Sequence, residues 1–175
     1  MDTALLQGLF GGDSGLQFVG GLVIAMVYAT VGMVAAAGSI LIAREVFQGR
    51  WEQYFWASFL IFIAAIYLSF AAYYGMSSDA WLTEFIGVGL FTACAIGGFF
   101  SRPTLAAGYV LHGLWDLMHS LSGTSLAGLS LTTIPLGYEV FCLAFDFTVA
   151  GYLIRSHAEW RAPGKFDPYF GRQGA

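Results

Sequence analysis

Residues 20–39 read GGLVIAMVYATVGMVAAAGS, a stretch that is rich in glycine and alanine and has no charged side chain. A helix that crosses the hydrocarbon core of a bilayer needs about 20 predominantly apolar residues. The uncharged run continues on both sides of this stretch, from Gln17 to Ala43. It therefore predicts a membrane-spanning helix over residues 17–43.

The composition of the whole chain agrees with a membrane location. Of the 175 residues, 58% are hydrophobic and only 10% are charged. Soluble domains are about 25% charged, so this chain has too few charges to cover a surface that faces water. Four further apolar segments follow the first. We expect an all-α, polytopic membrane helix bundle with five transmembrane helices, at residues 17–43, 54–74, 81–100, 104–121 and 135–154.

The basic residues predict how this bundle is oriented. With five spans, every Lys and Arg falls on one side of the membrane: Arg44, Arg50, Arg102, Arg155, Arg161, Lys165 and Arg172. Positively charged loops stay in the cytoplasm, which predicts an N-terminus outside and a cytoplasmic C-terminus. The chain then divides into a short extracytoplasmic segment (1–16), the transmembrane bundle (17–154) and a cytoplasmic basic-aromatic tail (155–175).

Three titratable residues stand close together in the fourth segment, in LHGLWDLMHS at residues 111–120. At 100° per residue, His112, Asp116 and His119 lie within an arc of about 60° on one face of a helix. Exposing an Asp to lipid at the bilayer centre costs about 2.5–3.5 kcal/mol on insertion scales. We therefore expect this face to point into the bundle.

Other segments supply acidic partners at similar depths. Glu84 lies near the start of the third segment, and Glu139 and Asp146 lie in the fifth. At about 1.5 Å per residue, Glu84, Glu139 and His119 fall near the outer surface, while Asp116 and Asp146 fall deeper. The sequence thus predicts a pocket lined by carboxylates and imidazoles in the outer half of the membrane.

Three interpretations of these residues stay open. The first is a divalent metal site, zinc or iron, since imidazole with carboxylate suits both metals. In that site Asp116 is a ligand together with His112 or His119, or it bridges two ions, and Asp146 or Glu84 completes the shell. The second is a relay in which histidines and carboxylates exchange protons. The third is structural pairing, in which buried polar side chains hold three helices in register.

The polar residues also resemble a known pattern. The stretch from Tyr73 to Leu153 resembles an uncharacterised family of small bacterial integral membrane proteins with an H-x-x-W-D-x-x-H motif. His112, Trp115, Asp116 and His119 match this motif, and Phe145 with Asp146 match a later F-D pair. The resemblance implies a bacterial cytoplasmic membrane location and the same choice of polar residues. It implies no reaction, because the family has no established activity.

Two classes of function follow. The first is an accessory or binding subunit of a larger membrane assembly, with the lipid bilayer, other membrane subunits or a homo-oligomer as partners. The short loops and the small-residue face of residues 20–39 favour it. The alternative is a membrane-embedded, metal-dependent hydrolase or oxidoreductase that acts on a lipid or isoprenoid, with Glu84 or Glu139 as proton acceptor. No basic run or patch indicates nucleic acid.

Overall fold

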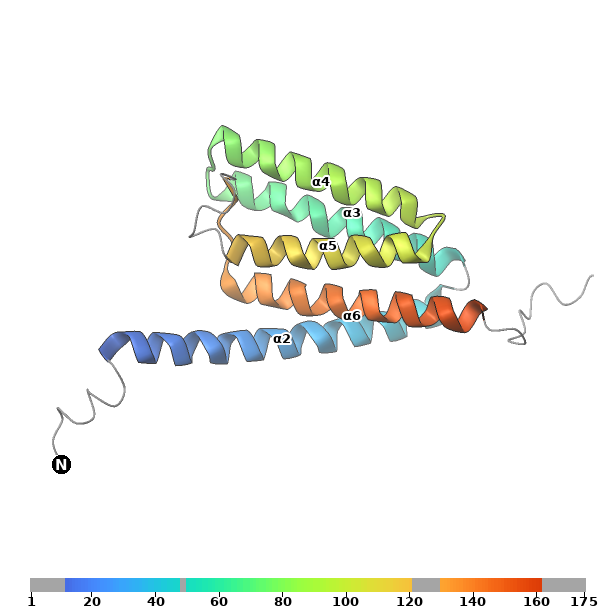
Figure 1. Cartoon of the computed structure of the whole chain (residues 1–175), viewed down its shortest axis with the longest axis horizontal. Helices are drawn as coiled ribbons and strands as arrows, with labels where there is room; N and C mark the ends of the chain where they lie inside the picture. The colour runs from blue at the N-terminus through green and yellow to red at the C-terminus, as the bar shows by residue number, and fades with distance from the viewer. Residues whose placement is uncertain (1–11, 48–49, 121–129, 162–175) are drawn as a thin grey trace, which may run out of the picture.

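The computed structural model describes residues 12–47, 50–120 and 130–161, and these residues form helices and no strand. The helices in chain order are α2 (Gly12–Val46), α3 (Arg50–Tyr73), α4 (Ser78–Gly98), α5 (Arg102–Ser120) and α6 (Leu136–Arg161). Figure 1 shows them running side by side along the long axis of the molecule. The predicted all-α class is confirmed. Most of the predicted N-terminal segment and of the tail lies outside the described residues.

Four of these helices are long and apolar enough to cross a membrane, at Phe18–Val46, Arg50–Tyr73, Ser78–Gly98 and Leu136–Ser156. Helix α5 is not among the four. Its 19 residues include Arg102, Asp116 and both histidines of the motif, and these polar side chains lower its hydropathy. The chain is therefore a membrane-type helical protein in which the least apolar helix holds the candidate site.

The turn between α3 and α4 is defined by local chemistry. Gly75 has a φ of 61°, a left-handed conformation that glycine adopts without steric cost. Ser77 then caps α4, because its side chain accepts a hydrogen bond of 3.3 Å from the backbone N–H of Ala80, which satisfies one of the free amide groups at the helix start. The turn makes α3 and α4 antiparallel neighbours.

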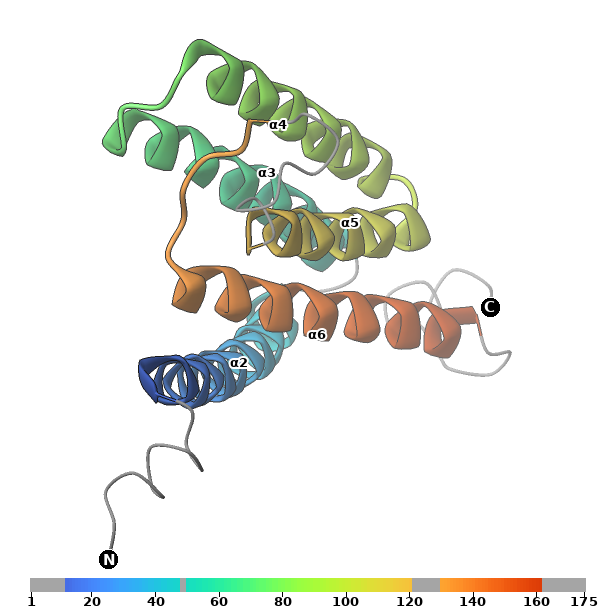
Figure 2. The same ribbon diagram turned by 60° about the vertical axis from the view of Figure 1, so that its left-hand side comes forward.

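Helix α5 occupies the centre of the bundle. It packs extensively against α4 and α6 and also contacts α3, while α2 packs mainly on α6. In Figure 2 the same helices are stacked from α4 at the top to α2 at the bottom. A side chain on α5 can therefore reach partners on α3, α4 and α6, which is what a site assembled from several helices requires.

The two ends of the bundle differ in charge. Arg44, Arg50, Arg102 and Arg155 lie near the ends of α2, α3, α5 and α6 at one end, which we call the arginine end. The opposite end holds the α3–α4 turn, the end of α5 and the start of α6 (Figure 1). We call it the α3–α4 end. No Lys or Arg of the described residues lies there.

Candidate functional site

The three polar residues of α5 point into the bundle. His112 and Asp116 are fully buried and His119 is nearly so. Residues three and four apart lie on the same face of a helix, and this face of α5 is turned toward α3, α4 and α6 rather than outward. The neighbouring residues Leu111, Leu114 and Leu117 are exposed, so the polar side chains and the exposed apolar side chains of α5 lie on different faces.

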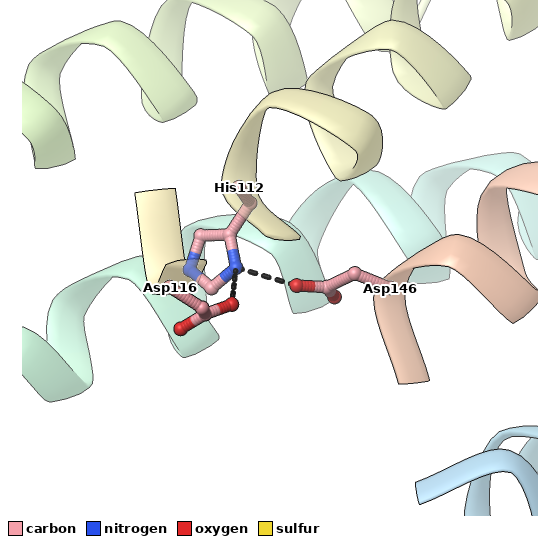
Figure 3. Close-up of side chains that lie close together, drawn as sticks. All are labelled: His112, Asp116 and Asp146. Carbon is pink, nitrogen blue, oxygen red and sulfur yellow. Dashed lines mark hydrogen bonds and ion pairs between the residues drawn. The ribbon is translucent and has the colours of Figure 1, made fainter. Parts of the chain in front are cut away.

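His112, Asp116 and Asp146 form one compact group, which we call the His–Asp group. The Nδ1 atom of His112 lies 2.7 Å from Oδ2 of Asp146 on α6 and 3.4 Å from Oδ2 of Asp116. One ligand atom from each residue lies within 4.8 Å of the others, and all three residues are buried. Figure 3 shows both carboxylates directed at the same ring nitrogen. This geometry places three potential metal ligands around a common point.

Tyr67 on α3 orients one of these carboxylates. Its hydroxyl donates a hydrogen bond to Oδ1 of Asp116, which leaves Oδ2 directed at His112. The Tyr67 ring also stacks on the His119 ring, with centroids 4.7 Å apart, and meets the His112 ring edge-on at 5.7 Å. Outer hydrogen bonds of this kind fix the orientation of metal-binding carboxylates and histidines.

Tyr67 was not among the residues predicted from the sequence. It lies within an apolar segment, and no pattern in that segment indicates that its hydroxyl faces the polar site. Its depth is the signal that could have identified it. Trp and Tyr of membrane proteins gather at the two interfaces, but Tyr67 lies six residues before the end of α3. An aromatic hydroxyl inside a span needs a hydrogen-bond partner, and Asp116 is that partner.

His119 and Glu84 form a second contact, separate from the His–Asp group. The Nε2 atom of His119 lies 3.0 Å from Oε1 of Glu84 on α4. The other ring nitrogen, Nδ1, lies 2.8 Å from the carbonyl oxygen of Trp115. A carbonyl oxygen only accepts hydrogen bonds, so Nδ1 carries a hydrogen and Nε2 is the nitrogen that faces the carboxylate. We call these two residues the Glu–His pair.

The segment that precedes α6 covers this pair. The backbone N–H of Thr132 donates a 3.0 Å hydrogen bond to Oε1 of Glu84, and Thr132 is fully buried. The sequence did not indicate Thr132, because it lies in a predicted loop and makes its contact through the backbone N–H. A backbone contact requires no particular residue type, so it produces no sequence pattern. Glu139, also expected near the site, is buried in the first turn of α6 but is not part of the His–Asp group.

Two glycines permit the close approach of the helices at the site. A Cβ atom on Gly113 would lie 3.2 Å from the Phe147 ring and 3.4 Å from Cβ of Asp146. A Cβ atom on Gly87 would lie 2.9 Å from the Trp115 ring. Gly113 thus lets α6 bring Asp146 to His112, and Gly87 lets the Trp115 ring lie close to α4. Small residues serve this purpose widely in membrane helix interfaces.

Several buried polar atoms at the site have no hydrogen-bond partner. In the His–Asp group they are Nε2 of His112, Oδ2 of Asp116 and Oδ1 of Asp146, and next to the Glu–His pair they are Oε2 of Glu84 and Oγ1 of Thr132. Burying polar groups without a partner is costly. Two carboxylates and a neutral imidazole carry two negative charges, and one divalent cation would cancel both. The donor set of the His–Asp group therefore fits a metal ion.

Comparison with known proteins places the chain in a family without identifying a reaction. Residues 20–159 match a protein family described as a family of unknown function (DUF6010). The match includes α3, α4 and α5 in full, most of α2 and all but the end of α6. No curated protein and no solved structure matches the chain.

Proposed function

The chain belongs to the DUF6010 family of unknown function, and we propose that it is an integral membrane protein that binds one divalent metal ion inside its helix bundle. The observation that supports this most is the His–Asp group, with three ligand atoms within 4.8 Å of one another. Imidazole and carboxylate together suit zinc or iron. His112, Asp116 and Asp146 are the proposed ligands, and Tyr67 orients Asp116.

The proposed topology has five spans, with the N-terminus outside and the C-terminus in the cytoplasm of a bacterial cell. Four helices are apolar enough to cross alone. We propose that α5 crosses with them, because its polar side chains are buried against α3, α4 and α6 and so avoid lipid. The concentration of arginine at one end of the bundle supports the orientation.

This topology predicts opposite locations for two fusion points. A reporter joined after Gly75, in the α3–α4 turn, should be active outside the cell, and one joined after Gly174 should be active in the cytoplasm. Three of the five proposed spans lie between the two fusion points, so the reporters must be on opposite sides. The one-sided arginines determine which side is cytoplasmic. Paired phosphatase and fluorescent-protein fusions measure it. Identical compartments for the two fusions would contradict five spans.

Metal binding predicts one zinc or iron ion per chain in the purified full-length protein. Cells expressing the protein are grown with both metals, and the metal content is measured after chelator washing and gel filtration in detergent. A ligand set that is buried on every side releases its ion slowly, so the ion should survive these steps. Wild-type protein without zinc or iron, also after incubation with either metal, would contradict the proposal.

The proposed biological role is that of an accessory or binding subunit in a larger membrane assembly or homo-oligomer. Helix α2 supports it, because α2 contacts the rest of the bundle mainly through α6 and presents large apolar side chains outward, among them Phe18, Val34 and Leu41. A second role is a metal-dependent enzyme acting on a lipid or isoprenoid. It is supported by the number of protein ligands, since catalytic zinc sites have three and keep one position open.

A further inference from the structure

The buried polar residues of the bundle are distributed unevenly along its length. Ten of the described residues are buried and polar or charged. Eight of them lie at mid-depth or between mid-depth and the α3–α4 end: Thr83, Glu84, His112, Asp116, His119, Thr132, Glu139 and Asp146. The other two, Glu52 and Ser156, lie near the arginine end. A polar lining therefore extends from the His–Asp group toward one end of the bundle only.

Bulky side chains fill the other half. Trp56 and Leu60 of α3 pack with Leu105 and Tyr109 of α5, and each of the four is fully buried. The Tyr109 hydroxyl donates a 2.8 Å hydrogen bond to the carbonyl oxygen of Trp56, so this layer also ties α3 to α5. A hydrated cation loses its favourable hydration in such a layer. The route to the His–Asp group from the arginine end is therefore blocked.

The Glu–His pair lies on the polar side of the His–Asp group. Glu84 is seven residues into α4, counted from the α3–α4 end, and His119 is one residue from the end of α5. His119 lies about 10.5 Å along the helix axis from His112. Glu84 contacts His119, so an ion moving inward from the α3–α4 end meets this pair before it meets Asp116 and His112.

One unused carboxylate oxygen makes the Glu–His pair suitable for a cation. Glu84 uses Oε1 for both Thr132 and His119, and its Oε2 atom is buried with no hydrogen-bond partner. The Oγ1 atom of Thr132 is also buried and lies beside the Glu84 carboxylate. A carboxylate oxygen, a hydroxyl and an imidazole nitrogen are all metal ligands in proteins.

Tyr67 connects the two parts of the site. Its ring stacks on His119 and its hydroxyl bonds to Asp116, so one side chain contacts a residue of the Glu–His pair and a residue of the His–Asp group. No Lys or Arg of the described residues lies at this end, so no permanently charged cationic side chain among them opposes an approaching ion. An acidic group such as Glu84 in a low-dielectric site raises the local cation concentration.

We propose that Glu84, His119 and Thr132 form an entry site, at which a divalent cation binds on its way from the α3–α4 end to the His–Asp group. This inference rests on the proposed metal binding. The entry site holds the ion in passing, and His112, Asp116 and Asp146 hold it at equilibrium. With the proposed orientation, the ion comes from outside the cell.

The test compares the rate of metal uptake with the amount bound at equilibrium. Metal-free, full-length wild-type protein and Glu84→Gln are mixed with Zn²⁺, and bound zinc is measured after rapid desalting at increasing times. Glu84→Gln should take up zinc at least about tenfold more slowly, because the charge that attracts the ion is gone. Both proteins should reach one zinc per chain.

Glu52→Gln is the matched control. Glu52 is also buried and accepts a hydrogen bond from a tyrosine, Tyr152, but it lies near the arginine end. Its substitution should leave the uptake rate unchanged. If Glu84→Gln does not fold, Thr132→Val decides, because it removes Oγ1 and keeps the backbone N–H; its uptake should be several-fold slower.

The outcomes separate this inference from the proposed function. A wild-type protein that binds no zinc would end the proposed function. If wild-type protein binds zinc and Glu84→Gln, or Thr132→Val in its place, takes it up at the wild-type rate, the entry site is wrong. If Glu84→Gln binds no zinc at saturation, Glu84 is a ligand of the bound ion, which also overturns the entry role.

Discussion

Replacing Asp116 by asparagine is expected to reduce the bound metal from one ion per chain to none and to leave the helix bundle folded. The amide has nearly the same shape, and its oxygen can still accept the hydrogen bond from Tyr67 that Oδ1 of Asp116 accepts. It loses the negative charge on which ligation by a carboxylate depends. Loss of a residue that only hydrogen-bonds to a metal ligand lowers the metal affinity roughly 10- to 100-fold. Loss of the ligand Asp116 should lower the affinity for zinc by more than that.

Melting temperature distinguishes this result from purely structural pairing. If Asp116 serves only to pair with His112, 3.4 Å away, the substitution breaks a buried charged contact. Such changes cost about 3–5 kcal/mol in soluble proteins. Under metal binding, the variant should instead melt close to the metal-free wild-type protein. Asp79→Asn, at an exposed position in the first turn of α4, is the control for the chemical change.

Replacing Gly113 by valine is expected to separate α5 from α6 and to impair both stability and metal binding. The first carbon atom of the new side chain would already lie 3.2 Å from the Phe147 ring, and valine adds two more carbon atoms. Overpacking of this kind typically costs about 1–3 kcal/mol. Because α6 carries Asp146, the same displacement should lengthen its 2.7 Å contact with His112 and weaken zinc binding.

Gly151→Val provides the matched control on α6. Gly151 is exposed, and a Cβ atom there would meet nothing within 4 Å. Both variants change the helix propensity in the same way, so the difference between their melting temperatures isolates the packing at Gly113. Equal melting temperatures and equal zinc affinities for the two variants would contradict the proposed contact between α5 and α6.

The sequence was sufficient to predict the helices but not the partners of each side chain. Runs of apolar residues between charges and turn residues predicted five helices, and the spacing of His112, Asp116 and His119 predicted one shared face. Counting residues along the helices predicted that Asp146 and Glu84 lie at depths similar to those of the polar residues of α5. Which carboxylate meets which histidine depends on how α4 and α6 are rotated about their axes, and spacing within one helix does not fix that rotation.

The division of the site into two parts illustrates this point. The sequence placed Glu84 and His119 in one ligand set with His112, Asp116 and Asp146. In the structure Glu84 pairs with His119, and the other three residues form the compact group. The family match covers residues 20–159. It extends beyond residues 73–153, which carry the resemblance to the H-x-x-W-D-x-x-H pattern, and it includes most of α2.

The most direct test of metal binding at the His–Asp group is X-ray absorption spectroscopy on zinc-loaded, full-length wild-type protein. His112, Asp116 and Asp146 predict a first shell of nitrogen and oxygen only, at about 2.0–2.2 Å, with the scattering pattern of a single imidazole. The shell should be lost in Asp116→Asn. A sulfur shell at about 2.3 Å would place the ion at Cys94 or Cys142 instead. That result, two imidazoles in the shell, or a protein that retains no zinc would contradict the assignment.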